Sequence, residues 1–452
     1  MSSTSTDATG SPAPAATTGD GSARGNRLAL LVIGLCWLLV LFDGLDMFVY
    51  GSVLPHMFET KALGINPDKA GNVGSYATFG MLIGALSSGT ISDWIGRKKT
   101  ILASTAVFSL ASALTAMAGS LGTFSAARFL TGLGLGGLLP SAITMVSEYA
   151  PRGKRALIVG SLMTAHQAGG ILAGYVALWT DSDWRTCFWI CVVPLFIGVP
   201  LAAKYLPESL KFLQAKGRDE EAGALAARYG VELTAPAGKP QAGDRWGALA
   251  TLFRGNLWVQ TLFYWLASFG GLLLVYGFSQ WLPTMMRNAG YDLGSSIGFT
   301  IVINLGGIFG MLVGGRLTDR FGGARICAVW FAFTAVGIYA LSFHMALALT
   351  YTVVFFTGFF LFSGQAMIYA TVADRSTDES RGTAVGWVSG MGRFGAVFGP
   401  WLGGQLLDTG SNTAGFTAFA LAGVFALVFV SLTGLRMFDP AARVPSGVPS
   451  PR

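Results

Sequence analysis

Two aspartates, Asp43 and Asp46, lie in the middle of the first long apolar stretch of the chain, residues 28–57. Their spacing places both carboxylates on one face of a helix, about one turn apart. A charged carboxylate inside a bilayer is costly unless it is paired, protonated or facing a water-filled cavity. The pair therefore predicts a site where a proton binds and leaves. A structural role stays open, with one aspartate in a permanent ion pair or capping a helix break near Gly44.

Two arginines also fall within apolar stretches, Arg128 at the start of one and Arg393 in the middle of another. The planar guanidinium offers two parallel donors that match a carboxylate. We therefore expect Arg393 to bind the carboxylate of a ligand, with a structural pairing to an acidic residue as the alternative. We expect Arg128 to approach the two aspartates and to couple their protonation to conformation, unless it only holds helices together.

Further polar and aromatic side chains in these stretches are candidates for the same site. His166 is a third candidate proton carrier because imidazole titrates near neutral pH, and Gln167 beside it offers a neutral hydrogen bond. Tyr276, Trp387 and Phe394 are candidates for stacking on an aromatic ligand, the last two because they flank Arg393. The alternatives are a histidine that is only hydrogen-bonded between helices and aromatic rings that face lipid.

Membrane helices are the elements that must position these residues. Of the 452 residues, 52% are hydrophobic and only 12% are charged, whereas soluble domains carry roughly 25% charged residues. This composition excludes a water-soluble fold. Twelve apolar segments are long enough to cross a hydrocarbon core of about 30 Å. They cover residues 28–57, 70–94, 100–120, 122–149, 155–180, 186–205, 257–286, 294–317, 325–347, 349–373, 382–407 and 413–436.

The order of these segments predicts an all-α polytopic membrane protein made of two six-helix bundles. A polar linker, partly helical over 207–229, divides the twelve segments into six and six. The tail at the start of the chain is rich in Ser, Thr, Ala, Gly and Pro, so we expect it to be disordered. The predicted regions are a cytoplasmic tail (1–26), an N-terminal bundle (27–206), a cytoplasmic linker (207–256), a C-terminal bundle (257–437) and a second cytoplasmic tail (438–452).

The positions of the basic residues predict the orientation in the membrane. With both termini in the cytoplasm, nearly all of the 30 Lys and Arg lie in cytoplasmic loops or tails, and only Lys61, Lys69, Arg185 and Arg287 lie outside. We therefore predict a multi-pass protein of the cytoplasmic membrane and no nucleic-acid partner. The four cysteines lie in apolar stretches without metal-type spacing, so we expect no disulfide, no metal and no cofactor.

A short motif occurs twice, and its copies are separated by half of the 452 residues. Each copy has a Gly, an Asp and a second Gly at equal spacing, as expected for two halves of common design. The first Gly allows close helix approach, the second allows a tight turn, and the Asp can pair with a nearby Arg. We expect these loops to gate the protein through salt bridges, rather than only to obey the charge rule. The residues assigned to gating are Gly89, Asp93, Gly96, Arg97, Glu148, Arg152, Gly315, Asp319 and Gly322.

The first copy, from Gly89 to Lys99, resembles the G-x-x-x-D-x-x-G-R-K signature of the major facilitator superfamily. The run from Arg128 to Gly137 is similar to the fourth-helix motif of that superfamily, and Glu148 to Arg155 is similar to the segment that follows it. Leu206-Pro-Glu-Ser209 is similar to the end of the sixth helix in symporter branches. The resemblance covers residues 27–437 and implies a secondary transporter that works by alternating access around a central site.

A narrower resemblance rests on Asp43-Gly-Leu-Asp46, which is similar to the D-G-x-D signature of the aromatic acid:proton symporters. The stretches 276–283 and 381–400 agree with it. The resemblance implies proton-coupled uptake of a benzoate-like or hydroxybenzoate-like anion, and it also points to Arg393 as the ligand of the carboxylate. The fifth helix lacks the proline of the exporter pattern after Gly169, which weakens an export function.

The sequence therefore predicts a monomer in the lipid bilayer whose partners are an aromatic carboxylate and protons. A symporter of a non-aromatic organic acid, such as a dicarboxylate or a shikimate-like compound, stays open and would be separated by competition between acids. A proton-driven exporter would be exposed by the direction of flux. A non-transporting sensor would bind ligand without moving it. An enzyme is not expected, because no nucleophile with a base, no metalloprotease motif and no nucleotide-binding loop occurs in the sequence.

Overall fold

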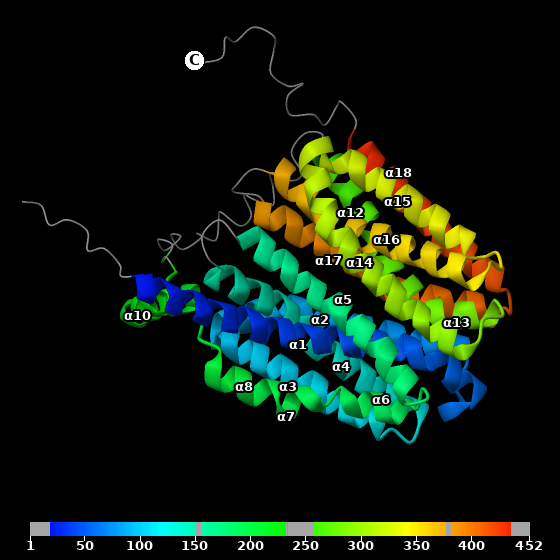
Figure 1. Cartoon of the computed structure of the whole chain (residues 1–452), viewed down its shortest axis with the longest axis horizontal. Coiled ribbons are helices and arrows are strands. Elements are labelled where there is room, and N and C mark those ends of the chain that lie inside the picture. Colours follow the sequence, from blue (N-terminus) through cyan, green and yellow to red (C-terminus); the bar gives the residue numbers. More distant parts are fainter. Residues whose placement is uncertain (1–18, 151–154, 232, 234–256, 377–380, 435–452) are drawn as a thin grey trace, which may run out of the picture.

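The computed structural model of the protein describes residues 19–150, 155–231, 233, 257–376 and 381–434. Within these ranges every regular element is a helix. Figure 1 shows two bundles that lie side by side, the first built from the N-terminal half of the chain and the second from the C-terminal half. The predicted all-α fold of twelve membrane helices in two six-helix bundles is thus confirmed.

The N-terminal bundle has five continuous helices and a sixth that is broken. The sequence predicts one helix over 186–205, but the chain interrupts it twice in this range. Pro194 and Pro200 explain the breaks, because proline lacks the backbone N–H that continues a helix. The elements are α1 (Gly19–Glu59), α2 (Pro67–Ile95), α3 (Arg97–Ala116), α4 (Leu121–Tyr149), α5 (Arg155–Trp179), and α6 (Trp184–Ile190), α7 (Val193–Phe196) and α8 (Gly198–Tyr205), with a short 3₁₀ turn η1 (Ala62–Gly64) after α1.

The C-terminal bundle begins with a helix that contains a π-helical turn, η2 (Leu274–Phe278), between α12 (Leu257–Leu273) and α13 (Ser279–Asn288). Pro283 lies inside α13, where its ring would otherwise press on the preceding turn, and a π turn is one way to relieve that contact. The remaining helices are α14 (Leu293–Phe321), α15 (Gly323–Ala340), α16 (Leu347–Arg375), α17 (Arg381–Asp408) and α18 (Asn412–Leu432).

Two polar regions outside the bundles are also helical. The sequence predicts helix in the linker between 207 and 229, and α9 (Leu210–Ala215) and α10 (Asp219–Tyr229) lie there. The tail was expected to be disordered through residue 26, whereas α1 already begins at Gly19. That expectation is wrong for residues 19–26, because adding residues to an existing helix is far easier than nucleating one.

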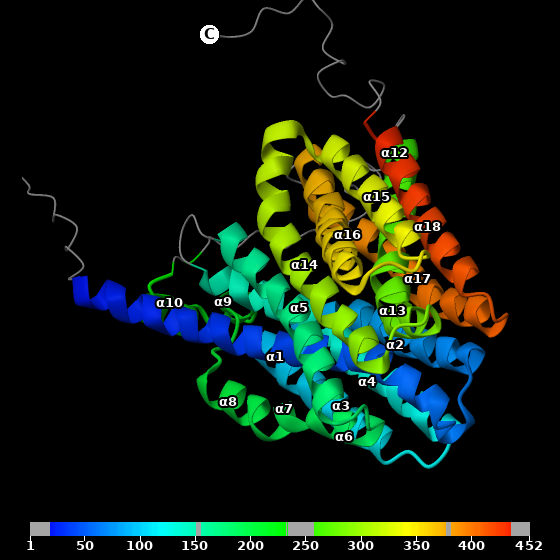
Figure 2. The ribbon, with the colours of Figure 1, turned by 45° about the vertical axis from the view of Figure 1, so that its right-hand side comes forward.

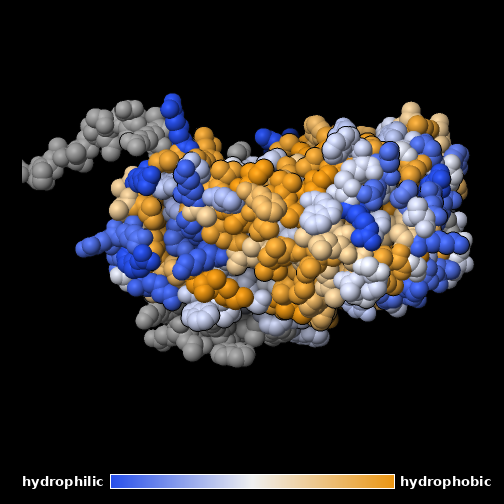
Figure 3. Space-filling view, turned by 90° about the horizontal axis from the view of Figure 1, so that it is seen from below, coloured by the Kyte–Doolittle hydropathy of each residue, from blue (hydrophilic) through white to orange (hydrophobic). Residues whose placement is uncertain are grey.

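The surface matches a protein that crosses a membrane. Nine helical segments of the described part are long and apolar enough to do so. Figure 3 shows an apolar band across the middle of one face, with hydrophilic residues gathered toward both ends. Three other helices are also of spanning length, α2, α5 and α17, and each packs against the opposite bundle, α2 against α17 and α5 against α14.

Among the described residues the two bundles meet at one end of the molecule, and we call this contact region the seam. It joins α1 to α13, α2 to α17 and α5 to α14. At its outer edge Glu59 pairs with Arg287 at 2.8 Å, and at its inner edge the Ser75 hydroxyl donates to the Val397 carbonyl at 2.7 Å. Figure 2 shows the bundles diverging toward the other end, where the start of α1, the helices α9 and α10 and the end of α18 lie. We call that end the open end.

Candidate functional site

Asp46 and Arg128 form an ion pair inside the N-terminal bundle, with 2.5 Å between Oδ1 and the guanidinium. The other carboxylate oxygen accepts a hydrogen bond from the Ser112 hydroxyl at 2.5 Å. The side chains of Asp46 and Arg128 are 0% and 2% exposed, and the guanidinium lies over the rings of Tyr50 and Phe188. Arg128 was predicted to approach the aspartates, and Asp46 is the one that it binds. This carboxylate is therefore buried inside the N-terminal bundle, where α1 faces α3 and α4.

Asp43 has a different environment, although it lies only one turn before Asp46. It is 1% exposed, and its Oδ1 is buried without a hydrogen-bond partner. Its charge interacts with that of Asp46 on the same helix and with that of Arg393 on α17 of the other bundle. The two aspartates therefore divide into one that is paired within its bundle and one that makes no ion pair among the described residues and lies within electrostatic range of the opposite bundle.

Arg393 lies where α17 and α2 separate. Val397, one turn further along α17, still contacts Ser75 of α2, whereas a Cβ added at Gly390, about one turn in the other direction, would meet nothing within 4 Å. The Arg393 side chain is half-buried and is within electrostatic range of Asp43 and Tyr276. It forms no ion pair with Asp43 in this conformation, so its guanidinium can receive another carboxylate.

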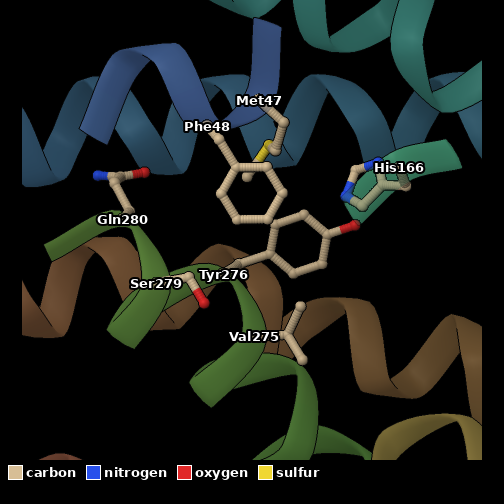
Figure 4. A pocket seen from close by; sticks show the side chains of 7 residues that line it. All are labelled: Met47, Phe48, His166, Val275, Tyr276, Ser279 and Gln280. Carbon is tan, nitrogen blue, oxygen red and sulfur yellow. The ribbon is translucent and has the colours of Figure 1, made fainter. Parts of the chain in front are cut away.

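A small pocket lies between the two bundles. Figure 4 shows Phe48 and Tyr276 among the side chains that line it, with the Tyr276 hydroxyl pointing toward His166. The rings of Phe48 and His166 are 5.5 Å apart and tilted. The lining residues come from three segments that meet at the inner edge of the seam: Met47 and Phe48 of α1, His166 of α5, and Val275, Tyr276, Ser279 and Gln280 of η2 and α13.

Several buried polar atoms around this pocket have no hydrogen-bond partner in the part of the chain that the structure describes. His166 Nδ1 and Gln167 Oε1 are buried and unsatisfied, and so are Ser279 Oγ and Gln280 Nε2. Buried polar groups are nearly always hydrogen-bonded to protein or water. Of the predicted residues, His166 and Tyr276 line the pocket, whereas Gln167 is buried beside it on α5 without lining it. The unsatisfied atoms mark this region as a place that receives water or a ligand.

Trp387 and Phe394, predicted to stack on a ligand because they flank Arg393, do not line the pocket. Phe394 is 51% exposed and Trp387 is 42% exposed, and Trp387 stacks on Trp265 of α12 at 5.6 Å between ring centres. Successive residues on a helix point about 100° apart, so a neighbour in sequence leaves the face of Arg393. Both rings therefore lie outside this pocket, and their stacking on a ligand stays a prediction.

The first copy of the repeated motif forms the expected ion pair, but within one loop. Asp93 and Arg97 are 2.6 Å apart, and the Arg97 guanidinium also donates to the Ser92 carbonyl at 3.1 Å. Gly96 and Gly322 have φ values of 100° and 87°, which only glycine adopts readily. The second glycine of each copy therefore makes the predicted tight turn.

Other gating expectations are not met in this conformation. A Cβ added at Gly89 or Gly315 would meet nothing within 4 Å, so the predicted close helix approach is absent there, because the bundles are separated at the open end. Glu148 accepts hydrogen bonds from the Ser209 hydroxyl at 2.7 Å and the Lys211 amide at 3.4 Å, and no ion pair of Glu148 occurs among the described residues. Asp319 lies in the last turns of α14, and its side chain and Arg152 lie outside the described residues.

Sequence reasoning missed three polar residues of these sites: Ser112, Ser279 and Gln280. A signal existed for two of them, because Ser279 and Gln280 follow Tyr276 at helical spacings of three and four and so share its face. No comparable signal pointed to Ser112, because its role depends on where α3 lies against α1.

Comparison with known proteins places the chain among transporters. The model of the Major Facilitator Superfamily matches residues 36–329 and 300–450. The benzoate transport protein of Acinetobacter baylyi is 32% identical, with 90% of each chain covered. The gentisate transporter of Corynebacterium glutamicum is 34% identical, covering 89% of this chain and 87% of the relative. The 4-hydroxybenzoate transporter PcaK of Pseudomonas aeruginosa is 31% identical, covering 89% and 92%.

Solved structures show the same fold. The partially occluded inward open conformation of the xylose transporter XylE from E. coli matches with a TM-score of 0.70 at 16% sequence identity. The match covers 89% of this chain and 97% of that chain. At this identity the likeness concerns the arrangement of the helices alone.

Proposed function

Since the chain belongs to the major facilitator superfamily, we propose that it takes up an aromatic carboxylate together with a proton by alternating access. It is a multi-pass membrane transporter and not an enzyme. The observation that carries the proposal is that Asp43 and Arg393 lie on opposite bundles, within electrostatic range of each other and of Tyr276 in the pocket wall. An acid that binds there touches both halves of the protein at once.

The aromatic substrate class is supported by the relatives and by the pocket. The three relatives described above are named for benzoate, gentisate and 4-hydroxybenzoate. In the pocket, Phe48 and Tyr276 offer ring faces, and Met47 and Val275 add apolar contact. Stacking on aromatic side chains favours a flat ring over a dicarboxylate or a shikimate-like acid. Competition between a labelled aromatic acid and unlabelled non-aromatic acids for uptake separates these alternatives.

The arrangement of charges couples the carboxylate to the proton. A cation favours the ionised form of a carboxylate near it, and Arg393 lies within electrostatic range of Asp43. A substrate carboxylate on Arg393 offsets that cation, so that Asp43 then takes a proton more readily. Substrate and proton therefore promote each other's binding, as linkage requires. The loaded site carries less uncompensated charge than a half-loaded one, which favours closure of the cavity around it.

Asp46 and Arg128 have a different task in this scheme. Because both are buried and paired, they hold α1 to α4 and supply a fixed charge pattern beneath Asp43. Asp43 is then the carboxylate that binds and releases the proton, and His166, which faces the Tyr276 hydroxyl, is the nearest second candidate for the proton route. Asp46 influences the proton through its charge rather than by carrying it.

The conformation corresponds to one stage of the cycle. The predicted orientation puts the termini and the linker, and hence the open end, in the cytoplasm of the cell and the seam at the outer surface of the cytoplasmic membrane. The structure then represents the inward-facing stage, from which substrate and proton leave. In the outward-facing stage the seam opens and the open end closes, bringing the loops with Gly89 and Gly315 toward the opposite bundle. We propose that a single chain is the working unit, because its two bundles form one complete site between them.

The direct test uses purified protein in proteoliposomes with an inward proton gradient. Radiolabelled benzoate or 4-hydroxybenzoate should accumulate above equilibrium and stop accumulating when an uncoupler collapses the gradient. Unlabelled aromatic acids should compete, whereas succinate and shikimate should not. Competition by the non-aromatic acids alone would replace the substrate class, and outward-directed flux driven by the gradient would replace uptake by export.

A further inference from the structure

The ion pair at the outer edge of the seam joins residues of the two bundles. Arg287 Nε donates to Glu59 Oε1 at 2.8 Å, and the two side chains are 40% and 42% exposed. Glu59 ends α1 of the N-terminal bundle, and Arg287 lies in the last turn of α13 of the C-terminal bundle. Opening of the seam separates the two residues, because each moves with its own bundle.

The Arg287 guanidinium is also held by its own bundle. Its Nη1 donates to the Tyr291 carbonyl at 3.2 Å. Asp292 is within electrostatic range, but its carboxylate caps α14 by accepting a hydrogen bond from the Ser295 amide at 2.8 Å. When Glu59 withdraws, the guanidinium therefore keeps its position while the N–H that Glu59 engaged becomes free. A positioned guanidinium with free N–H groups is a good ligand for another carboxylate.

Polar side chains lead from Arg287 into the molecule along α13, and we call Arg287, Thr284 and Gln280 the α13 row. Spacings of three and four residues place all three on one face of the helix. The opposite bundle covers this face. A Cβ added at Gly51 of α1 would lie 2.5 Å from the Gln280 carbonyl oxygen, and one added at Gly74 of α2 would lie 2.5 Å from Gln280 Nε2. The α13 row spans about 10 Å and ends at Gln280, which lines the pocket.

Two atoms of the α13 row lack the hydrogen bonds that buried polar groups normally make. Thr284 Oγ1 and Gln280 Nε2 are buried and have no partner among the described residues. A threonine inside a helix can donate to the carbonyl of the preceding turn, as Thr105 and Thr131 do at 2.8 and 3.0 Å, but Thr284 does not. Both atoms gain access to water or ligand when α1 and α2 leave this face. The α13 row therefore fits a surface that is wet when the seam is open.

We propose that Arg287 is an outer capture site for the substrate carboxylate, and that Glu59 occupies this site while the seam is packed. The inference rests on the proposed function and its orientation in the membrane, and it adds a binding step before Arg393. Because the Glu59 carboxylate stands where the substrate carboxylate binds, the two exclude each other. Substrate on Arg287 therefore favours the seam-open state, and the acid then passes Thr284 and Gln280 on its way to the pocket.

The test is uptake of radiolabelled 4-hydroxybenzoate into right-side-out membrane vesicles that contain the full chain, with KM measured at low and high salt. The Debye length falls from about 30 Å at 0.01 M salt to about 3 Å at 1 M, so the KM of the wild type should rise with salt. Arg287→Gln should raise the low-salt KM about 3- to 10-fold and remove most of the salt dependence. Glu59→Gln should instead lower the KM by up to about 5-fold, because it unmasks Arg287.

The opposite signs separate a capture site from a contact that only holds the seam, since both substitutions break the same ion pair. A shift of KM in the same direction in both variants overturns the capture site. The matched control is Arg185→Gln, which removes an exposed charge whose guanidinium donates to the Ala116 and Ala118 carbonyls of its own bundle. It should keep the KM and the salt dependence of the wild type.

Three further outcomes are decisive, and KM reads them independently of how much protein folds. An unchanged KM in Arg287→Gln overturns the capture site and leaves the proposed function intact. An effect of Arg185→Gln equal to that of Arg287→Gln also overturns it, because the net charge of the outer face then explains both. If wild-type vesicles take up no aromatic acid, the proposed function itself has failed and the capture site fails with it.

Discussion

Gly404 of α17 offers a sharp test of the two-conformation account, because it closes the seam. A Cβ added there would lie 2.6 Å from the Pro67 carbonyl oxygen and 2.8 Å from the Gly71 Cα, and both of these are backbone atoms of the opposite bundle. Gly404→Ala therefore strains the conformation in which the seam is packed and does not strain one in which the bundles separate there. Overpacking of this kind costs about 1–3 kcal/mol, which shifts the ratio of the two conformers about 5- to 150-fold toward the seam-open state.

The control lies on the same helix. A Cβ added at Gly386 would meet nothing within 4 Å, so Gly386→Ala changes helix propensity without wedging the bundles apart. The readout is the rate at which a membrane-impermeant maleimide labels a Gly390→Cys reporter, which faces open space at the open end. The four native cysteines are buried, so background labelling should be low. Labelling should slow in Gly404→Ala and stay unchanged in Gly386→Ala; equal rates in all three proteins would refute the role of the seam.

Three further predictions follow from the contacts of the charged residues. Asp46→Asn should destabilise the folded protein by about 3–5 kcal/mol, because it leaves Arg128 buried without its partner. Asp43→Asn should leave the thermal midpoint of unfolding nearly unchanged. Equal losses of stability for the two variants in detergent would contradict the division between the two aspartates. Arg393→Lys should raise the KM for the carboxylate at least tenfold, because an ammonium lacks the two parallel donors, and an unchanged KM would remove Arg393 from the site. Asp93→Asn should cost less than about 1 kcal/mol, because its ion pair with Arg97 is largely exposed, yet it should slow transport if the loop gates the open end.

Much of the fold follows from composition and spacing, because apolar segments of spanning length leave few alternatives in a bilayer. Asp43 and Arg393 stood out as candidates because a charged side chain inside a membrane-spanning segment is costly and therefore points to a function. The choice of Asp46 over Asp43 as the partner of Arg128 could not be derived, because it depends on how α4 and α3 are placed against α1. Trp387 and Phe394 lie outside the pocket because residues adjacent in sequence point to different sides of a helix.

Conformation is a second reason why the sequence falls short. Gly89 and Gly315 are placed for close helix approach, but the open end separates the bundles and leaves both without a neighbour. Under the proposed alternating access one sequence encodes two arrangements of the same helices, and any one structure displays the contacts of only one of them. The breaks in the sixth span, by contrast, were available from Pro194 and Pro200, because proline acts locally.

The central claim is that a carboxylate and a proton travel together through Arg393 and Asp43. The most direct measurement follows the pH inside proteoliposomes with a trapped dye when 4-hydroxybenzoate is added outside without any imposed gradient. Wild-type protein should acidify the interior as the substrate enters. Asp43→Asn should still exchange labelled for unlabelled substrate but should move no protons. Acidification by Asp43→Asn equal to that of the wild type, or substrate entry into wild-type vesicles without acidification, would contradict the account.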